Sequence, residues 1–256
     1  MATHRTRRRR TRRAVALAVG LGGLAAAGRQ AARRSWASGD DPCGPDGLAL
    51  PEGEDRTVTV DDGAELAVRL AGPIDGPVVV LPHCWTGSRA IWAPVARILV
   101  SSGHRVVLYD QRGHGASTFG AGRTDMERLG ADLREVLEQL DLHDVVLAGH
   151  SMGGMTVQAL AKEDPDVVRK RARGVVLVST SAKVMPRPVP SSAVQVAVGA
   201  RAIGPWFRGP AGLQMARGAV GDRAHRAHVI ASRDHFIDTH ASARAGPWRG
   251  PPSPGA

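Results

Sequence analysis

A serine flanked by glycines lies near the middle of the chain, in the sequence Gly149-His150-Ser151-Met152-Gly153. This spacing fits the pattern G-x-S-x-G, in which a tight turn from a strand into a helix exposes the serine hydroxyl. A serine is a weak nucleophile unless it is held beside a base, with positive dipoles ready for the developing negative charge. We therefore predict that Ser151 attacks a carbonyl carbon. We also predict that its backbone is strained, with glycine needed two positions away on either side.

The loop that follows the apolar run from Val78 to Leu81 is predicted to stabilise the oxyanion formed in such an attack. An oxyanion hole takes one backbone N–H from the residue after the nucleophile and a second from a loop of this kind. Met152 would supply the first N–H and Trp85 the second. The indole of Trp85 has an alternative interpretation, a hydrophobic cover over the following helix. The two roles are compatible, because catalysis needs only the backbone of Trp85.

A third polar loop, Asp110 to Ser117, leaves a predicted strand that ends at Tyr109. Its Asp110 and Arg112 are expected to fix the turn through hydrogen bonds rather than to take part in catalysis.

Short β-branched runs alternate with helical stretches over residues 56–182, which we predict to form the core domain. Strand pairing around the turn Asp61-Asp62-Gly63 predicts an antiparallel hairpin. Strands alternating with helices at this rhythm give right-handed crossovers and a mainly parallel sheet. The sequence therefore predicts an α/β fold with flanking helices and an antiparallel hairpin at its start. The predicted strands lie at 57–60, 66–70, 78–81, 106–109, 145–148 and 175–178, and the predicted helices at 91–99, 126–140 and 152–162.

Three motifs in this order resemble those of the α/β-hydrolase fold superfamily, on the branch of lipases, esterases and cofactor-free haloperoxidases. They are His83-Cys84-Trp85, Asp110 to Ser117 and Gly149 to Gly154. The resemblance implies a serine hydrolase that acts on small-molecule carboxylic esters and needs no cofactor. Perhydrolase or haloperoxidase chemistry on the same serine is the alternative activity. Family members usually have glycine where this chain has Cys84, so a side chain must fit into the oxyanion loop.

The resemblance also implies an Asp or Glu at the end of a later strand and a His after the last strand. Beyond Val178 the sequence shows no further apolar strand. Residues 183–240 resemble a partial helical cap, and residues 241–256 form an irregular tail rich in proline and glycine. His83 and His150 flank the serine, but neither side chain is positioned there as a general base. We therefore predict that the last strands are missing, that the triad acid and base are unknown, and that activity is crippled. A non-catalytic, truncated remnant is the alternative.

A cluster of aspartates and histidines in the predicted cap allows one metal-binding alternative. His225 and His228 have helical i, i+3 spacing and could share a metal ion, but no motif supplies further ligands. A solvated polar surface is the favoured interpretation, and no metal or cofactor is predicted. The cluster comprises Asp222, His225, His228, Asp234, His235, Asp238 and His240.

The net charge of +10 arises at the N-terminus, because residues 1–34 contain ten arginines and no acidic residue. These arginines lie on both sides of an apolar run at 14–28, and a basic segment followed by an apolar one is the order found in an export signal. The run is shorter than the roughly 20 residues that a helix needs to span a bilayer. We predict a signal or membrane anchor at 1–34, a linker at 35–55, and an exported or membrane-associated protein. A disordered Ala/Arg-rich arm is the alternative. This location of the charge argues against nucleic-acid binding, and Cys43 and Cys84 provide no disulfide framework.

Overall fold

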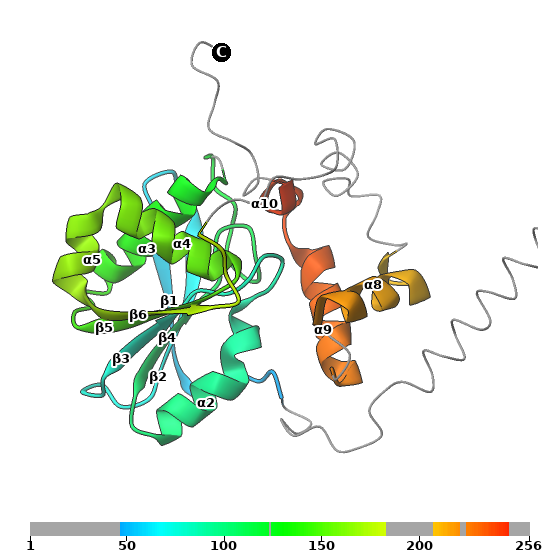
Figure 1. Ribbon diagram of the computed structural model, residues 1–256, viewed down its shortest axis with the longest axis horizontal. Helices are drawn as coiled ribbons and strands as arrows, with labels where there is room; N and C mark the ends of the chain where they lie inside the picture. Colours follow the sequence, from blue (N-terminus) through cyan, green and yellow to red (C-terminus); the bar gives the residue numbers. More distant parts are fainter. Residues whose placement is uncertain (1–46, 123, 183–206, 221–223, 246–256) are drawn as a thin grey trace, which may run out of the picture.

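The computed structural model describes residues 47–122, 124–182, 207–220 and 224–245 (Figure 1). Its centre is a six-stranded mixed sheet in the order β1-β2-β4-β3-β5-β6. Strands β1 and β2 form an antiparallel hairpin, β2 is antiparallel to β4, and the pairs β3/β4, β3/β5 and β5/β6 are parallel. The predicted α/β fold with a hairpin at its start is therefore confirmed. The strands are β1 Gly53–Thr59, β2 Glu65–Ala71, β3 Val78–Leu81, β4 Arg105–Tyr109, β5 Val145–His150 and β6 Ala172–Val178.

Helices cover both faces of the sheet (Figure 1). Helices α3 (Met126–Gln139) and α4 (Met152–Glu163) pack on one face, and α2 (Ala93–Ser101) with the 3-10 helix η1 (Arg89–Trp92) on the other. Successive side chains of a strand point to opposite faces. In β3, Val80 accordingly joins the cluster under α3 and α4, whereas its neighbours on either side join the cluster under α2. This burial on both faces explains the continuous apolar runs of the central strands.

Within the described residues, three further helices, here called the cap helices, follow the sheet in sequence and lie beside it (Figure 1). They are α8 (Pro210–Val220), α9 (Arg226–Asp238) and α10 (Ala241–Ala245). All regular structure described beyond residue 182 is helical.

Several predicted boundaries were wrong. Strand β1 begins at Gly53, inside the predicted linker. The sequence did not reveal this start, because charged pairs such as Asp55–Arg69, at 2.7 Å, take the place of an apolar alternation along this strand. Helix α5 (Pro165–Arg171) was not predicted, because none of its residues is buried and no apolar period marks it. Helix α10 lies in the predicted irregular tail, where Ala243 is fully buried.

Strand β6 forms one edge of the described sheet and pairs only with β5 there. Its four apolar residues Val175, Val176, Leu177 and Val178 are 38–48% exposed. Such an edge offers unpaired backbone groups and apolar side chains to other molecules.

The predicted signal or anchor at 1–34, most of the linker, and Cys43 lie outside the described residues, as do positions 183–206 of the cap and 246–256 of the tail. No helix in the described part of the chain is long and apolar enough to span a membrane.

Candidate active site

Ser151 occupies the turn between β5 and α4 and has a strained backbone. Its φ of 52° with ψ of −114° lies in a region that residues other than glycine rarely adopt. Two hydrogen bonds hold it there: Ser151 N–H donates to the Val178 carbonyl at 2.9 Å, and the Thr180 hydroxyl donates to the Ser151 carbonyl at 2.7 Å. The predicted strain at the serine is therefore confirmed, and β6 contributes directly to it.

The glycines around Ser151 are required by close backbone contacts. A Cβ atom on Gly149 would lie 2.5 Å from the backbone of Gly153, and one on Gly153 would overlap the Pro82 carbonyl oxygen. A Cβ on Gly154 would lie 2.7 Å from the Thr180 side chain, which holds the serine. The predicted need for glycine two positions before and after the serine is thus confirmed.

The loop from Pro82 to Ser88, here called the oxyanion loop, lies against this turn. His150 N–H donates to the Pro82 carbonyl at 3.2 Å. Met152 is fully buried and is the first residue of α4. Its N–H is therefore one of the N-terminal amides that have no acceptor within the helix. Trp85 lines the same cavity as Ser151. The structure therefore brings the two predicted oxyanion donors and the serine to one end of the sheet.

The indole of Trp85 contacts the cap helices. Its Nε1–H donates to the Arg244 carbonyl at 3.2 Å, and its ring meets that of Phe236 edge to face, with centroids 6.2 Å apart. The side chain therefore covers the site from the cap side, while the role of the Trp85 backbone N–H as an oxyanion donor stays a prediction.

His83 stabilises the oxyanion loop and is fully buried. Its Nδ1–H donates to the Cys84 carbonyl at 2.8 Å, and its Nε2 accepts from Gln111 N–H at 2.9 Å. Burial lowers the pKa of His83 to about 4, so the imidazole is neutral near pH 7. The Cys84 thiol is free, half-buried, and its pKa is raised by burial to about 11.

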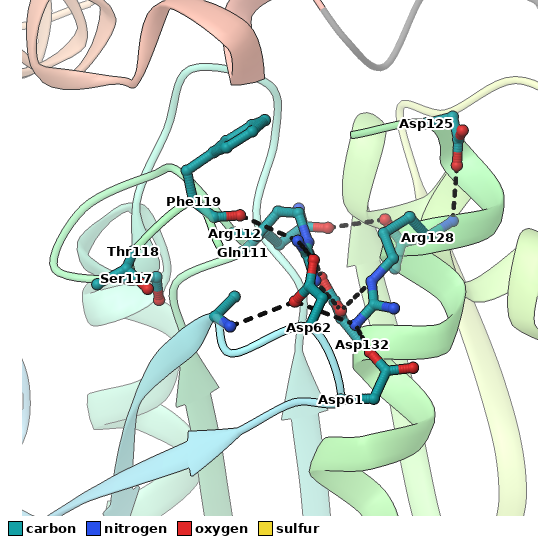
Figure 2. A network of polar contacts seen from close by, with 12 residues as sticks. Asp61, Asp62, Gln111, Arg112, Ser117, Thr118, Phe119, Asp125, Arg128 and Asp132 are labelled. Carbon is teal, nitrogen blue, oxygen red and sulfur yellow. Dashed lines mark hydrogen bonds and ion pairs between the residues drawn. The ribbon is translucent and has the colours of Figure 1, made fainter. Parts of the chain in front are cut away.

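Arg112 anchors the loop that follows β4, as Figure 2 shows. Its fully buried guanidinium pairs with Asp132 of α3 at 2.6 Å and with Asp62 of the hairpin turn at 2.6 Å. Asp110 accepts hydrogen bonds from Arg89 N–H at 2.6 Å and from Ala116 N–H at 3.0 Å. The prediction that Asp110 and Arg112 fix this turn is confirmed.

A cavity of about 590 Å³ opens in front of Ser151, between the oxyanion loop and the cap helices. Much of its wall is apolar and is formed by Trp85, Phe207, Met215, Ala216, Val220 and Phe236. A second cavity of about 420 Å³ shares Cys84, Trp85, Thr86 and His150 with the first and extends toward His235.

The structure departs from the predicted solvated surface at His235 but agrees with it at His240, which is exposed. His235 is partly buried, and its Nε2 lies 3.2 Å from the Ser88 hydroxyl, while His240 stacks on Phe119 with ring centroids 4.6 Å apart. Both side chains thus bind the cap helices to loops of the core. The rings of His225 and His228 are in edge contact at 6.1 Å, and the described residues include no group of three or more potential ligands for a metal ion.

No described carboxylate or imidazole hydrogen-bonds to the Ser151 hydroxyl. His150 is adjacent in sequence, but its half-buried ring meets Trp92, and burial lowers its pKa. The triad acid and base are accordingly assigned to no residue in the described part of the chain.

Sequence reasoning missed two residues next to the site. Gln111 and Thr156 are fully buried and hydrogen-bonded to each other across 45 positions of sequence. A contact between residues so far apart leaves no local pattern by which it could have been found.

Comparison with known proteins agrees with this geometry. Residues 77–208 match the family described as alpha/beta hydrolase fold. The chain is 38% identical over 130 residues to a non-heme chloroperoxidase of Streptomyces lividans, covering 50% of this chain and 46% of the relative. It is 37% identical over 97 residues to a bifunctional esterase/perhydrolase of Acinetobacter calcoaceticus, covering 38% of this chain and 35% of the relative.

A solved structure of a hydrolase from Pseudomonas aeruginosa PA01 superposes with a TM-score of 0.61 at 28% identity, covering 76% of this chain and 71% of that one. The chain spans about half the length, or less, of the curated relatives that it matches. The strained serine between β5 and α4 and the family match over residues 77–208 lead to one conclusion: the chain belongs to the α/β-hydrolase fold family.

Proposed function

We propose that this chain is a serine hydrolase that acts on carboxylic esters by acyl transfer through Ser151. The observation that carries this proposal is the strained backbone of Ser151, which places the residue at the head of α4 and on the wall of an apolar cavity. Strain of this kind persists only where the surrounding structure enforces it, and it is concentrated at functional sites.

The reaction would proceed in two steps. The Ser151 hydroxyl oxygen attacks the carbonyl carbon of the ester, and the N–H groups of Met152 and Trp85 donate to the negatively charged oxygen of the tetrahedral intermediate. The alcohol then leaves, and water releases the acid from the acyl-enzyme. The positive end of the α4 dipole favours the same negative charge. The residues that take up the proton of Ser151 and orient the base are unassigned.

The cavity favours an ester with apolar substituents. Phe207, Met215 and Phe236 line it, and the side chain of Arg233 on its wall is paired with Asp234 at 2.8 Å. Burial of an apolar group contributes about 25 cal/mol for each Å² removed from water. We therefore propose that an uncharged, apolar acyl group binds here.

The name of one relative, a bifunctional esterase/perhydrolase, favours perhydrolase chemistry as a second candidate function. The acyl-enzyme would be identical, but hydrogen peroxide would replace water in the second step. Attack by a peroxide oxygen on the acyl carbon would form the peracid and return the proton to Ser151. The remaining alternative is a chain without catalytic activity.

Hydrolysis of p-nitrophenyl butyrate by the full chain, with Ser151→Ala as control, tests the proposal. We expect wild-type hydrolysis above the Ser151→Ala background, and greater rates for butyrate than for a charged succinate ester. Peracid formation from p-nitrophenyl butyrate and hydrogen peroxide, absent from Ser151→Ala, would identify the second activity. Equal rates for wild type and Ser151→Ala in both assays would support the non-catalytic alternative.

We also propose that residues 1–34 direct the chain out of the cytoplasm or onto a membrane. Their ten arginines bracket the apolar run at 14–28, and the rest of the chain has no net charge. Fractionation of cells expressing the full chain or a version starting at Ser35 tests this. Equal recovery of both in the soluble cytoplasmic fraction would contradict it.

A further inference from the structure

Gln111 lies two residues beyond the carboxyl end of β4, is 1% exposed, and touches both elements that carry the predicted oxyanion donors. We propose that its side chain is a positioning residue that sets the separation of the Trp85 and Met152 N–H groups. This inference rests on the proposed function and assigns a new role within the same site.

The Gln111 amide bridges two segments that are distant in sequence. Its Nε2–H donates to the His83 carbonyl at 2.6 Å, and its Oε1 accepts from the Thr156 hydroxyl at 2.7 Å. His83 belongs to the oxyanion loop and Thr156 to α4. One amide group therefore fixes the distance between the loop and the helix.

On the loop side, the bridge reaches the position of Trp85 through two further bonds. Gln111 N–H donates to His83 Nε2 at 2.9 Å, and the opposite ring nitrogen of His83 donates to the Cys84 carbonyl at 2.8 Å. The Cys84 carbonyl belongs to the same peptide unit as the Trp85 N–H. Its orientation therefore determines where that N–H points.

On the helix side, the bridge ends one turn from Met152. The Thr156 hydroxyl also lies 3.0 Å from the Met152 carbonyl, so a displacement of Thr156 is transmitted to the first turn of α4. Gln111 is itself held in place, because the next residue is Arg112, whose ion pairs are drawn beside it in Figure 2.

Glutamine suits this position because both of its polar atoms find a buried partner. An aliphatic residue would leave the His83 carbonyl without the Gln111 Nε2–H donor and the Thr156 hydroxyl without the Gln111 acceptor. Valine at position 156 keeps the shape of threonine and removes only the hydroxyl that donates to Gln111. Thr156→Val is therefore the milder and more informative variant.

Saturation kinetics of a fluorophosphonate on the full chain test the inference, since the reagent develops negative charge on its phosphoryl oxygen as Ser151 attacks. The measured quantities are the maximal labelling rate constant, kinact, and the half-saturating concentration, KI. We compare Gln111→Leu and Thr156→Val with Gln139→Leu, a matched exchange on the exposed side of α3 whose Nε2 donates to the Thr59 carbonyl at 2.8 Å.

We expect kinact to fall roughly 10-fold or more in Gln111→Leu and Thr156→Val, because complete loss of one oxyanion donor costs about 10²–10³ in rate. KI should stay within about twofold, because ground-state binding in the cavity does not depend on the donors. The double variant should lose no more than the more affected single variant, since both changes break one bridge. Gln139→Leu should match wild type. Unchanged kinact, or kinact and KI that change together with the unfolding midpoint, would overturn the inference.

Hydrogen exchange separates this inference from the proposed function. In Thr156→Val, amides of the oxyanion loop at residues 83–86 should exchange faster together with those at the start of α4. Faster exchange confined to α4 would show that the bridge does not couple the two segments, and would overturn the inference. If the wild type is not labelled at Ser151, the proposed function fails, and this coupling is decided by hydrogen exchange alone.

Discussion

Replacement of Arg112 by methionine should destabilise the fold more than the loss of any exposed ion pair. Methionine keeps an unbranched chain but removes a guanidinium that is fully buried and paired with Asp132 and Asp62 at 2.6 Å each. Both carboxylates would lose a bidentate partner (Figure 2).

The expected loss follows from the burial of the partners. Removing one member of a buried ion pair costs about 3–5 kcal/mol, because the remaining charge is left buried and unpaired. Asp132 keeps Arg128 at 3.0 Å, and the Asp62 side chain is 15% exposed and gains some hydration. We therefore expect a decrease of about 3 kcal/mol in the free energy of unfolding, a large part of the 5–15 kcal/mol that is typical of a domain.

Urea unfolding followed by tryptophan fluorescence measures this decrease. Arg134→Met is the matched control, because Arg134 is 32% exposed and its pairs with Glu135 and Asp164 lie at 3.4 and 3.5 Å. An exposed pair of this kind contributes less than about 1 kcal/mol. Equal, small effects of the two variants would refute the reasoning that the buried network fixes the loop after β4.

Three further outcomes follow from the structure. Gly153→Ala should reduce fluorophosphonate labelling at least roughly 10-fold and destabilise the chain by about 1–3 kcal/mol, because the added methyl overlaps backbone, whereas Gly174→Ala meets no atom within 4 Å and should lose neither labelling nor stability. Stability should fall as the pH drops from about 4 to about 2, because hydrogen bonding to Arg112 lowers the pKa of Asp62 from 3.8 to about 2; the slope should be shallower in a melting series of Arg112→Met, where Asp55 and Asp61, whose pKa values Arg69 and Arg128 lower, still contribute. Leu177→Lys on the exposed edge β6 should increase the monomer fraction in size-exclusion chromatography, and a wild-type chain that is fully monomeric at the same concentration would contradict this.

The sheet could be predicted because its signals are local. Runs such as Val78 to Leu81 are buried on both faces and therefore continuously apolar, and the strained turn at Ser151 requires glycines at fixed positions. The same argument explains the failure at α5, whose residues are all at least partly exposed and leave no apolar period.

The contacts around the serine and the oxyanion loop could not be predicted, because they join distant segments. Ser88 meets His235 across 147 positions, and Gln111 meets His83 across 28. A polar residue that is buried by such a contact looks in sequence like a solvated one. For this reason His235 was assigned to a solvated surface, and Gln111 was not singled out.

Covalent labelling of the full chain with a fluorophosphonate, followed by peptide mapping in a mass spectrometer, tests the central claim most directly. We predict a single adduct, on the peptide that contains Ser151, and none in Ser151→Ala. The serine that would compete is Ser88, whose hydroxyl lies 3.2 Å from His235 Nε2. An adduct on Ser88, or labelling that persists unchanged in Ser151→Ala, would contradict the assignment of Ser151 as the nucleophile.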